Sequence, residues 1–229
     1  MKKITLLVAL MITSLGFAQM SFPFTFETGT TTFTDFDGGA VTQIANPVPG
    51  GINTSATVAK MVKSAGQPWA GSKIVLAAPI DFSVNKVMKV KVYFPVAGKK
   101  LLLKLEGGTA FEINSPVVPA NVWTELTFDY SGISNNTNPQ LVFIFDLGTM
   151  GDGTANSTYY FDDVTFSPPA VVYDPIVLPL DFENANQNFV FGDFAGGVMT
   201  KVANPDTNGN PSANCLKMVK SAGETYGGS

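Results

Sequence analysis

Hydrophobic and polar residues alternate with a period of two over most of the chain up to residue 167, which is the pattern of β-strands with one buried face. In the segment 86–94, Met88, Val90, Val92 and Phe94 are separated by residues that would point to the other face. No window shows helical spacing. The alternation predicts strands over 22–26, 86–94, 101–106, 125–130 and 159–166, and further strands near 41–45, 58–64 and 73–77.

The segment 141–145, Leu-Val-Phe-Ile-Phe, is apolar at every position, as is typical of a central strand that is buried on both faces. Glycine, proline and aspartate separate the predicted strands and mark turns between them. These turn residues stand at 37–39, 49–51, 97–98, 107–108 and 151–153. Many short strands with such turns predict an all-β fold, an antiparallel two-sheet jelly-roll sandwich.

The stretch 35–72 recurs near the end of the chain as 193–229, with the shared residues in the same order. The period of about 157 residues is that of a domain and not of a short solenoid repeat. Within the repeat, Lys60-Met61-Val62-Lys63 recurs as Lys217-Met218-Val219-Lys220. We expect this segment to be a core strand with Met61 on one face and the lysines on the other. The sequence therefore predicts a tandem repeat whose second copy is incomplete.

The N-terminus predicts secretion. Lys2 and Lys3 precede an apolar run, 4–12, and small residues follow at 16–18, which is the pattern of a signal peptide. The run is too short for a transmembrane helix, so no membrane insertion is expected. We predict a signal peptide at 1–18, a first module at 19–167, a Pro-rich linker at 168–175 and the N-terminal part of a second copy at 176–229. The predicted location is secreted, extracellular or at the cell surface.

Charge and composition exclude several classes of function. Without Lys2 and Lys3 the formal net charge of −4 becomes −6, and the chain has no Arg, which argues against nucleic acid as a partner. The absence of His removes Ser-His-Asp and Cys-His triads and His-ligated zinc. The single cysteine, Cys215, cannot form a disulfide within one chain. We therefore predict that this part of the protein is not an enzyme, although a linked catalytic or further binding domain can follow residue 229.

Motifs at the two ends of the first module resemble those of jelly-roll carbohydrate-binding modules with a galactose-binding-domain-like fold. The opening Thr25-Phe26-Glu27 and the closing Tyr160-Phe161-Asp162-Asp163-Val164 carry the resemblance. It implies a structural Ca²⁺ held by the Thr25 carbonyl, Glu27 and Asp162, with Asp163 as a further candidate. Calcium prefers such hard oxygen ligands. Alternation places Asp162 on one face with Val164, where a carboxylate needs a partner or a metal. The alternative is that these acids are solvated charges at strand ends.

The segments 60–64, 69–72 and 161–164 are most similar to accessory modules of secreted bacterial polysaccharide-degrading enzymes such as laminarinases. Sugar binding uses aromatic rings that stack on pyranose faces. Trp69 is the leading candidate, and its counterpart in the second copy is Tyr226. The alternative is that both rings belong to the core. Tyr93 is a weaker surface candidate, and for Trp123 we favour a buried structural role.

The resemblance implies a non-catalytic extracellular carbohydrate-binding module that targets a secreted glycoside hydrolase or the cell surface to a polysaccharide. A β-glucan is the ligand that the likeness to laminarinase modules suggests. The alternative function is a structural or adhesive spacer of a surface protein, without a sugar site. Exposure of Trp69 together with polar side chains on one concave face would distinguish these two functions.

Overall fold

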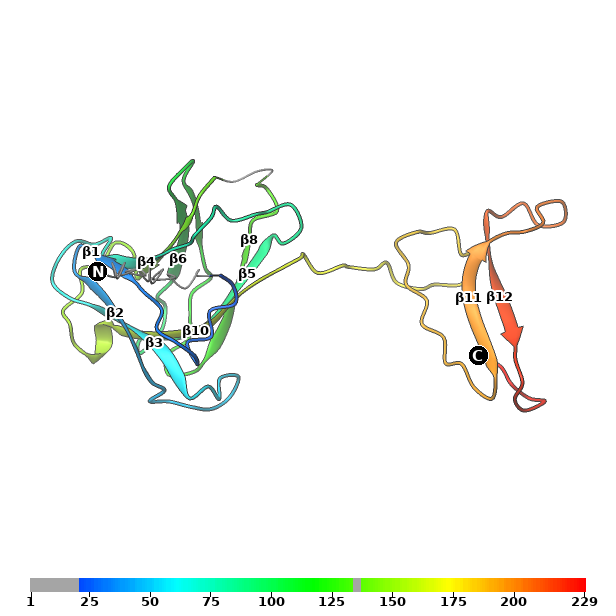
Figure 1. The fold of residues 1–229 in the computed structure, drawn as a ribbon, viewed down its shortest axis with the longest axis horizontal. Helices are drawn as coiled ribbons and strands as arrows, with labels where there is room; N and C mark the ends of the chain where they lie inside the picture. Colours follow the sequence, from blue (N-terminus) through cyan, green and yellow to red (C-terminus); the bar gives the residue numbers. More distant parts are fainter. Residues whose placement is uncertain (1–20, 134–136) are drawn as a thin grey trace, which may run out of the picture. The chain divides into compact units, whose positions relative to one another are not determined.

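The computed structural model describes residues 21–133 and 137–229, and the predicted signal peptide lies outside them. The chain divides into two compact units, Met1–Pro169 and Ala170–Ser229 (Figure 1). The boundary between these units falls within the predicted linker. In the described residues, no helix is long and apolar enough to cross a lipid bilayer.

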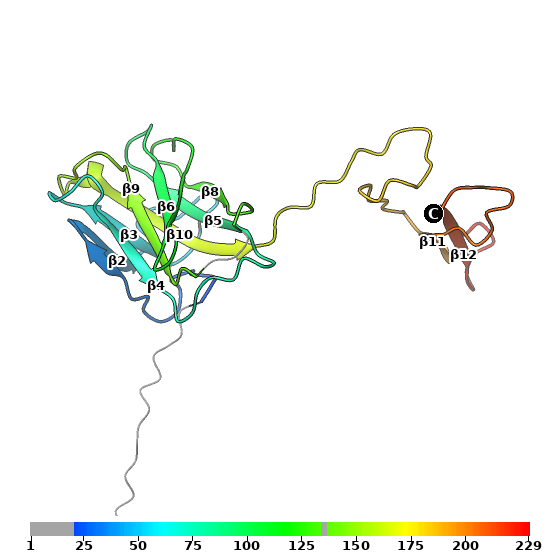
Figure 2. The ribbon, with the colours of Figure 1, turned by 90° about the horizontal axis from the view of Figure 1, so that it is seen from above.

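The first unit is a sandwich of two five-stranded antiparallel sheets, layered on one another in Figure 2. We name each sheet by its central strand. The β9 sheet has the order β1 (Thr34–Phe36), β4 (Gly71–Val75), β9 (Gln140–Phe145), β6 (Leu101–Glu106) and β7 (Phe111–Asn114). The β10 sheet has the order β2 (Gly39–Ala45), β3 (Thr57–Lys63), β10 (Thr158–Ser167), β5 (Val87–Tyr93) and β8 (Thr124–Asp129).

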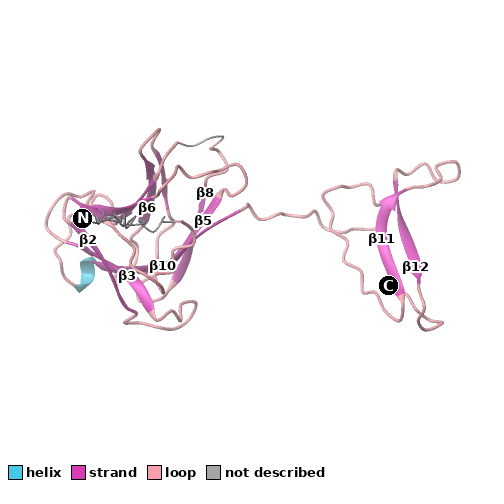
Figure 3. Cartoon of the chain, viewed as in Figure 1, coloured by secondary structure: helices cyan, strands magenta, loops and turns pink. Residues whose placement is uncertain are grey.

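The predicted fold class is confirmed. All strands paired within the two sheets run antiparallel, and the helix of the described residues is a single 3₁₀ turn, η1 (Ala155–Ser157) (Figure 3). The predicted strands over 86–94, 101–106 and 141–145 correspond to β5, β6 and β9. The short edge strands β1 and β7 were not predicted.

Aromatic side chains from the two central strands fill the core between the sheets. Phe143 of β9 lies 4.9 Å from Phe161 of β10, measured between ring centroids, and Phe145 stacks on Tyr159 at 4.9 Å. All four side chains are at most 2% exposed. The outward residues of β9, Val142 and Ile144, are also buried, at 1% and 6%. The prediction of a central strand that is buried on both faces is therefore confirmed.

The predicted opening strand over 22–26 is wrong. Only Phe24 pairs with a neighbour, through two backbone hydrogen bonds of 2.9 Å with Val164. Pro23 has no N–H to donate to a ladder, and Phe26 has a φ of 57°, which is outside the extended region. Phe24 and Phe26 nevertheless remain core residues, at 5% and 2% exposed.

The predicted orientation of Lys63 is also wrong. Its side chain is 1% exposed, because a period of two places residue 63 on the same inward face as Met61. Its ammonium donates hydrogen bonds to the backbone oxygens of Pro68 at 2.8 Å, Phe145 at 3.0 Å and Asp146 at 2.9 Å. Burial lowers the pKa of Lys63 from its ordinary value, although the charge of Asp146 opposes that effect.

The second unit contains an antiparallel pair of strands, β11 (Gly197–Ala203) and β12 (Asn214–Lys220). Two side-chain contacts of the first unit have counterparts here. Asp193 accepts from the Met199 N–H at 3.0 Å, as Asp35 does from Val41, and Glu183 accepts from Asn214, as Glu27 does from Thr57. These residues stand at equivalent positions of the sequence repeat.

Candidate functional site

A groove of about 430 Å³ lies on the outer face of the β9 sheet. Trp69 and Asp37 lie on the loops beside β4 and β1, and β4, β6 and β7 contribute outward side chains. We call this feature the groove. Its lining residues are Thr34, Phe36, Asp37, Trp69, Lys73, Leu102, Lys104, Glu106, Glu112, Ile144 and Leu147.

Strand register aligns residues from distant parts of the sequence in one row across the outer face of the β9 sheet, and all of them except Val142 are polar. Thr34 of β1 pairs with Lys73 of β4, and Lys73 pairs with Val142 of β9. Val142 pairs in turn with Lys104 of β6, which pairs with Glu112 of β7. Paired residues on one face of a sheet have neighbouring side chains. The row therefore crosses all five strands of the sheet.

Val142, the apolar member of this row, forms a small buried cluster with Leu102 and Ile144, and Phe36 packs against it. Leu102 and Ile144 are 2% and 6% exposed, although they point away from the main core. Their burial explains why residues 141–145 of β9 are all apolar: one face packs in the sandwich and the other lies under the groove. The groove thus has an apolar floor with polar side chains beside it.

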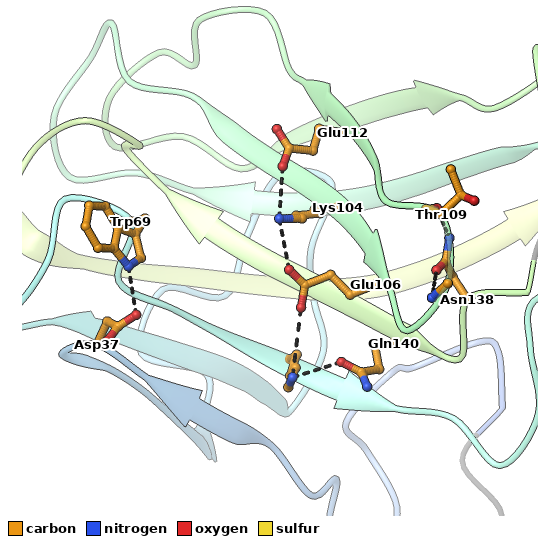
Figure 4. A network of polar contacts seen from close by, with 10 residues as sticks. Asp37, Trp69, Lys104, Glu106, Thr109, Glu112, Asn138 and Gln140 are labelled. Atoms are coloured by element: carbon orange, nitrogen blue, oxygen red, sulfur yellow. Dashed lines mark hydrogen bonds and ion pairs between the residues drawn. The ribbon is translucent and has the colours of Figure 1, made fainter.

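Trp69 is 49% exposed, so the alternative that it belongs to the core is wrong. Its indole N–H donates to the Asp37 carboxylate at 2.8 Å (Figure 4). Asp37 stands in a tight turn between β1 and β2 with a φ of 54°, a conformation that Asp tolerates better than most residues. The carbonyl of Pro68, directly before Trp69, accepts from the buried Lys63 ammonium. The ring is therefore exposed but held at both its polar edge and its backbone.

An ion-pair ladder, made of Lys73, Glu106, Lys104 and Glu112, crosses the sheet beside Trp69 (Figure 4). Lys104 lies 2.9 Å from Glu106 and 3.0 Å from Glu112, and Lys73 lies 3.9 Å from Glu106. Lys73 also donates to the Gln140 side chain at 2.8 Å. Hydrogen bonds to Glu106 and then Glu112 raise the pKa of Lys104. The ladder presents alternating charges whose hydrogen-bonding capacity is only partly used.

Within the first unit, the structure does not bring the sequence-predicted sugar-binding aromatics Trp69 and Tyr93 together. Trp69 lines the groove, whereas Tyr93 lies on β5 in the other sheet, with its ring centroid 6.0 Å from that of Tyr160. Tyr226 is 68% exposed in the second unit. Trp123 is 6% exposed and donates to the Val48 carbonyl at 2.8 Å, which confirms its predicted buried role.

The four predicted calcium ligands have different environments. Asp162 is fully buried and accepts from the Asn53 side-chain amide at 2.9 Å and from the Asp163 N–H at 2.8 Å. Burial raises the pKa of Asp162, although hydrogen bonds, from Ser55 foremost, oppose that shift. The Asp163 carboxylate instead forms an ion pair of 2.6 Å with Lys91. Exposed Glu27 accepts from the Thr57 N–H at 3.0 Å, and Thr25 is half-buried.

The predicted shared face of Asp162 and Val164 is wrong. A β-bulge lies between Asp162 and Thr165, where Asp163 has a φ of 45°. A bulge inserts an extra residue and reverses which side chains point inward after it. Val164 therefore joins the main core with Phe161, while Asp162 contacts Asn53 outside that core.

The donor set fits calcium only in part. Among residues 21–133 and 137–229, no three His, Cys, Asp or Glu side chains gather as they would around a metal ion. Asp162 is, however, a buried carboxylate whose hydrogen bonds come from neutral donors. A buried charge of this kind favours a cation as a partner. Carbonyl oxygens and Glu27 would have to supply most of the other ligands.

Sequence reasoning missed most of the groove. Asp37, Lys73, Lys104, Glu106 and Glu112 were not candidates. The alternation in 101–106 did place Lys104 and Glu106 on the outward face of one strand. The alternation does not show which strands are neighbours in the sheet, so it could not predict the ion-pair ladder.

No family model matches the sequence, and no curated relative matches it. Solved structures similar to this one include the CBM22-1–GH10 modules of endo-1,4-β-D-xylanase 10B of Clostridium thermocellum, complexed with xylohexaose. That match has a TM-score of 0.47 and 18% identity, and it covers 70% of this chain and 30% of the xylanase chain.

Two isolated modules are similar over most of their own length. A xylan-binding domain from CBM22 matches with a TM-score of 0.43 and 16% identity, covering 66% of this chain and 96% of that domain. A CBM61 module in complex with β-1,4-galactotriose matches with a TM-score of 0.40 and 13% identity, covering 66% and 99%. These structural neighbours are carbohydrate-binding modules, the kind of module that the sequence motifs resemble.

Proposed function

We propose that the first unit is a non-catalytic carbohydrate-binding module and that the groove is its polysaccharide site. The observation that carries this proposal is the placement of exposed Trp69, held by Asp37, in the same groove as the ion-pair ladder. An aromatic ring beside convergent polar side chains is the usual construction of a sugar site. The volume of about 430 Å³ lies within the range of small-ligand sites, which is roughly 300–1,000 Å³.

The chemistry of the groove favours binding over hydrolysis. Glycoside hydrolysis needs one carboxyl group as a proton donor and a second as a base or nucleophile. Glu106 and Glu112 both form ion pairs with the same ammonium, that of Lys104. Neither carboxylate is therefore placed as a proton donor. Asp37, the third acid of the groove, accepts from the Trp69 indole.

We also propose a cellular setting for this module. The predicted signal peptide, 1–18, would direct it outside the cell, where it would hold a linked enzyme or the cell surface on a polysaccharide such as a β-glucan. The second unit, with Tyr226 at the position of Trp69, would add a second site on the same chain. Two linked sites raise the overall affinity without any new contact.

A structural Ca²⁺ near Asp162 is a further part of the proposal. The neutral surroundings of this buried carboxylate support it. Asp162, Glu27 and the Thr25 carbonyl would hold the ion, which would neutralise the buried charge and tie the opening segment to β10. The ion pair between Asp163 and Lys91 makes Asp163 the weakest of the four candidate ligands.

Native affinity electrophoresis tests the proposed function. The full chain is run through gels that contain soluble β-1,3-glucan, β-1,4-glucan, xylan or galactan, and its mobility is compared with that in a plain gel. We expect retention by at least one polymer and loss of that retention in Trp69→Ala. Wild-type mobility that is unchanged in every polymer would overturn the proposal and favour the spacer function.

A further inference from the structure

We infer, on the basis of the proposed function, that the groove selects uncharged polysaccharides and discriminates against chains that carry carboxylate or sulfate groups. The charge inventory of the groove supports this specificity. Three carboxylates, Asp37, Glu106 and Glu112, face two ammonium groups, Lys73 and Lys104. The formal charge of the lining is thus −1, and both cations already contact carboxylates of the ladder.

An anionic sugar would need a cation that is free to pair with it. Lys104 is held between Glu106 and Glu112 at 2.9 and 3.0 Å. Lys73 donates to Gln140 at 2.8 Å and lies 3.9 Å from Glu106. A ligand carboxylate near either ammonium would also lie near the carboxylate that the ammonium already contacts. Repulsion between the two anions would oppose the attraction of the cation.

Sugar hydroxyl groups match the ladder better than anionic groups do. A hydroxyl both donates and accepts, so it can accept from an ammonium N–H and donate to the neighbouring carboxylate at the same time. An ammonium has three donors, and an ionised carboxylate has about four acceptor sites, so the ladder keeps unused capacity of both kinds. A carboxylate or sulfate on the ligand only accepts and can use only half of that pattern.

The Trp69 ring adds a stacking contact whose strength does not depend on the charge of the polysaccharide. Half of Trp69 is exposed and its N–H donates to Asp37, so the exposed part of the ring would stack on a sugar. The carboxylate of Asp37 at that edge would repel an anionic group bound beside the ring. Stacking would therefore supply affinity, and the carboxylates on either side of the floor would supply the selectivity against anions.

The test compares polymers that share a backbone and differ only in charge. The full chain is run in affinity gels that contain hydroxyethyl or carboxymethyl derivatives of β-1,3-glucan, β-1,4-glucan and β-1,4-xylan, at equal degrees of substitution. We expect the dissociation constant for the carboxymethyl form to be at least tenfold higher than for the hydroxyethyl form of the same backbone. Added NaCl should reduce this difference, because it screens repulsion between exposed charges.

The double variant E106Q/E112Q tests the cause. It changes the formal charge of the groove from −1 to +1 and frees Lys104, so it should gain retention on the carboxymethyl polymers. Glu125→Gln is the matched control, because Glu125 forms an ion pair of 2.6 Å with Lys89 on the other sheet. This control should leave both dissociation constants unchanged. Melting temperatures establish that each variant is folded.

The possible outcomes separate the two proposals. Equal or stronger retention on the carboxymethyl forms would overturn the selectivity and leave the sugar site standing. The inference would also be overturned if the selectivity persisted in E106Q/E112Q or did not respond to salt. Either result would show that the carboxylates of the groove are not the source of the selectivity. No retention of the wild type on any derivative or on the unmodified polymers would overturn the proposed function, and this inference with it.

Discussion

The indole nitrogen of Trp69 lies 2.8 Å from a carboxylate oxygen of Asp37, across a gap of 32 residues in the sequence. This hydrogen bond fixes the ring at the end of the groove while leaving 49% of the residue exposed. In the second unit the equivalent positions are Tyr226 and Ala195, which cannot form the same pair. The two units therefore differ at the residue pair that defines the candidate site.

Substitution of the two tryptophans separates binding from folding. Trp69→Ala should abolish retention on polysaccharide and change the melting temperature little, because the ring is half exposed. Trp123→Ala is the matched control and should destabilise the protein by roughly 3–5 kcal/mol, as expected for a buried aromatic side chain. Retention and thermal unfolding are measured on the same preparations. A Trp69→Ala protein that still binds at full strength would contradict the proposed site.

Loss of the Asp37 carboxylate should weaken binding without unfolding the module. In Asp37→Ala the indole N–H loses its partner and the ring is free to rotate, so we expect a dissociation constant about three- to tenfold higher. Isothermal titration with the preferred polysaccharide measures this change. Asp81→Ala provides a control at another exposed aspartate, outside the groove, and should bind like the wild type. Equal affinity of both variants would show that the hydrogen bond does not position the ring.

Lys63 should couple the stability of the module to the position of the Trp69 loop. In Lys63→Met, three backbone carbonyls lose the ammonium that they share, and we expect a destabilisation of roughly 3 kcal/mol. Lys60→Met, on the outward face of the same strand, should stay within about 0.5 kcal/mol of the wild type. Urea denaturation monitored by tryptophan fluorescence gives both values. Similar stabilities for the two variants would refute the structural role of Lys63.

Calcium should raise the melting temperature if the site near Asp162 exists. An ion at 100 times its dissociation constant stabilises a folded protein by about 2.7 kcal/mol, and EDTA should reverse the gain. Asp162→Asn should remove the response to calcium, whereas Asp163→Asn should keep it, because Asp163 pairs with Lys91. Differential scanning calorimetry of the three proteins, with and without EDTA, decides the matter. If neither calcium nor EDTA changes the melting temperature of the wild type, the protein has no such site.

Alkaline pH should destabilise the first unit through Tyr159. Burial, with smaller effects of Asp146 and Asp152, raises the pKa of Tyr159 from 10 to about 12. The contribution of this residue to stability is therefore complete below pH 10 and is lost as the pH rises to about 12, because the unfolded state ionises first. Tyr159→Phe should lose less stability over that interval. Parallel slopes for the two proteins in pH-dependent denaturation would contradict this assignment.

The sequence pattern by itself determined most β-strands of the first unit, but not the short edge strands β1 and β7. Successive side chains of a strand point to opposite faces, so the alternation within β5 or β6 alone shows which of its faces is buried. The same local logic marked β9 as a central strand. It failed over 22–26 and after Asp162, because Pro23, Phe26 and a bulge at Asp163 interrupt the extended backbone.

Only the tertiary structure decided which residues form the groove. Lys73 of β4 and Glu106 of β6 lie on the same sheet because β9, which comes later in the sequence, pairs with both of these strands. Their side chains approach each other across β9. The contacts of Trp69 with Asp37, and of Lys63 with the carbonyl of Phe145, likewise join segments that no local pattern links. Strand order and register are set by the packing of distant segments against one another, and a period of two records only the direction of each side chain.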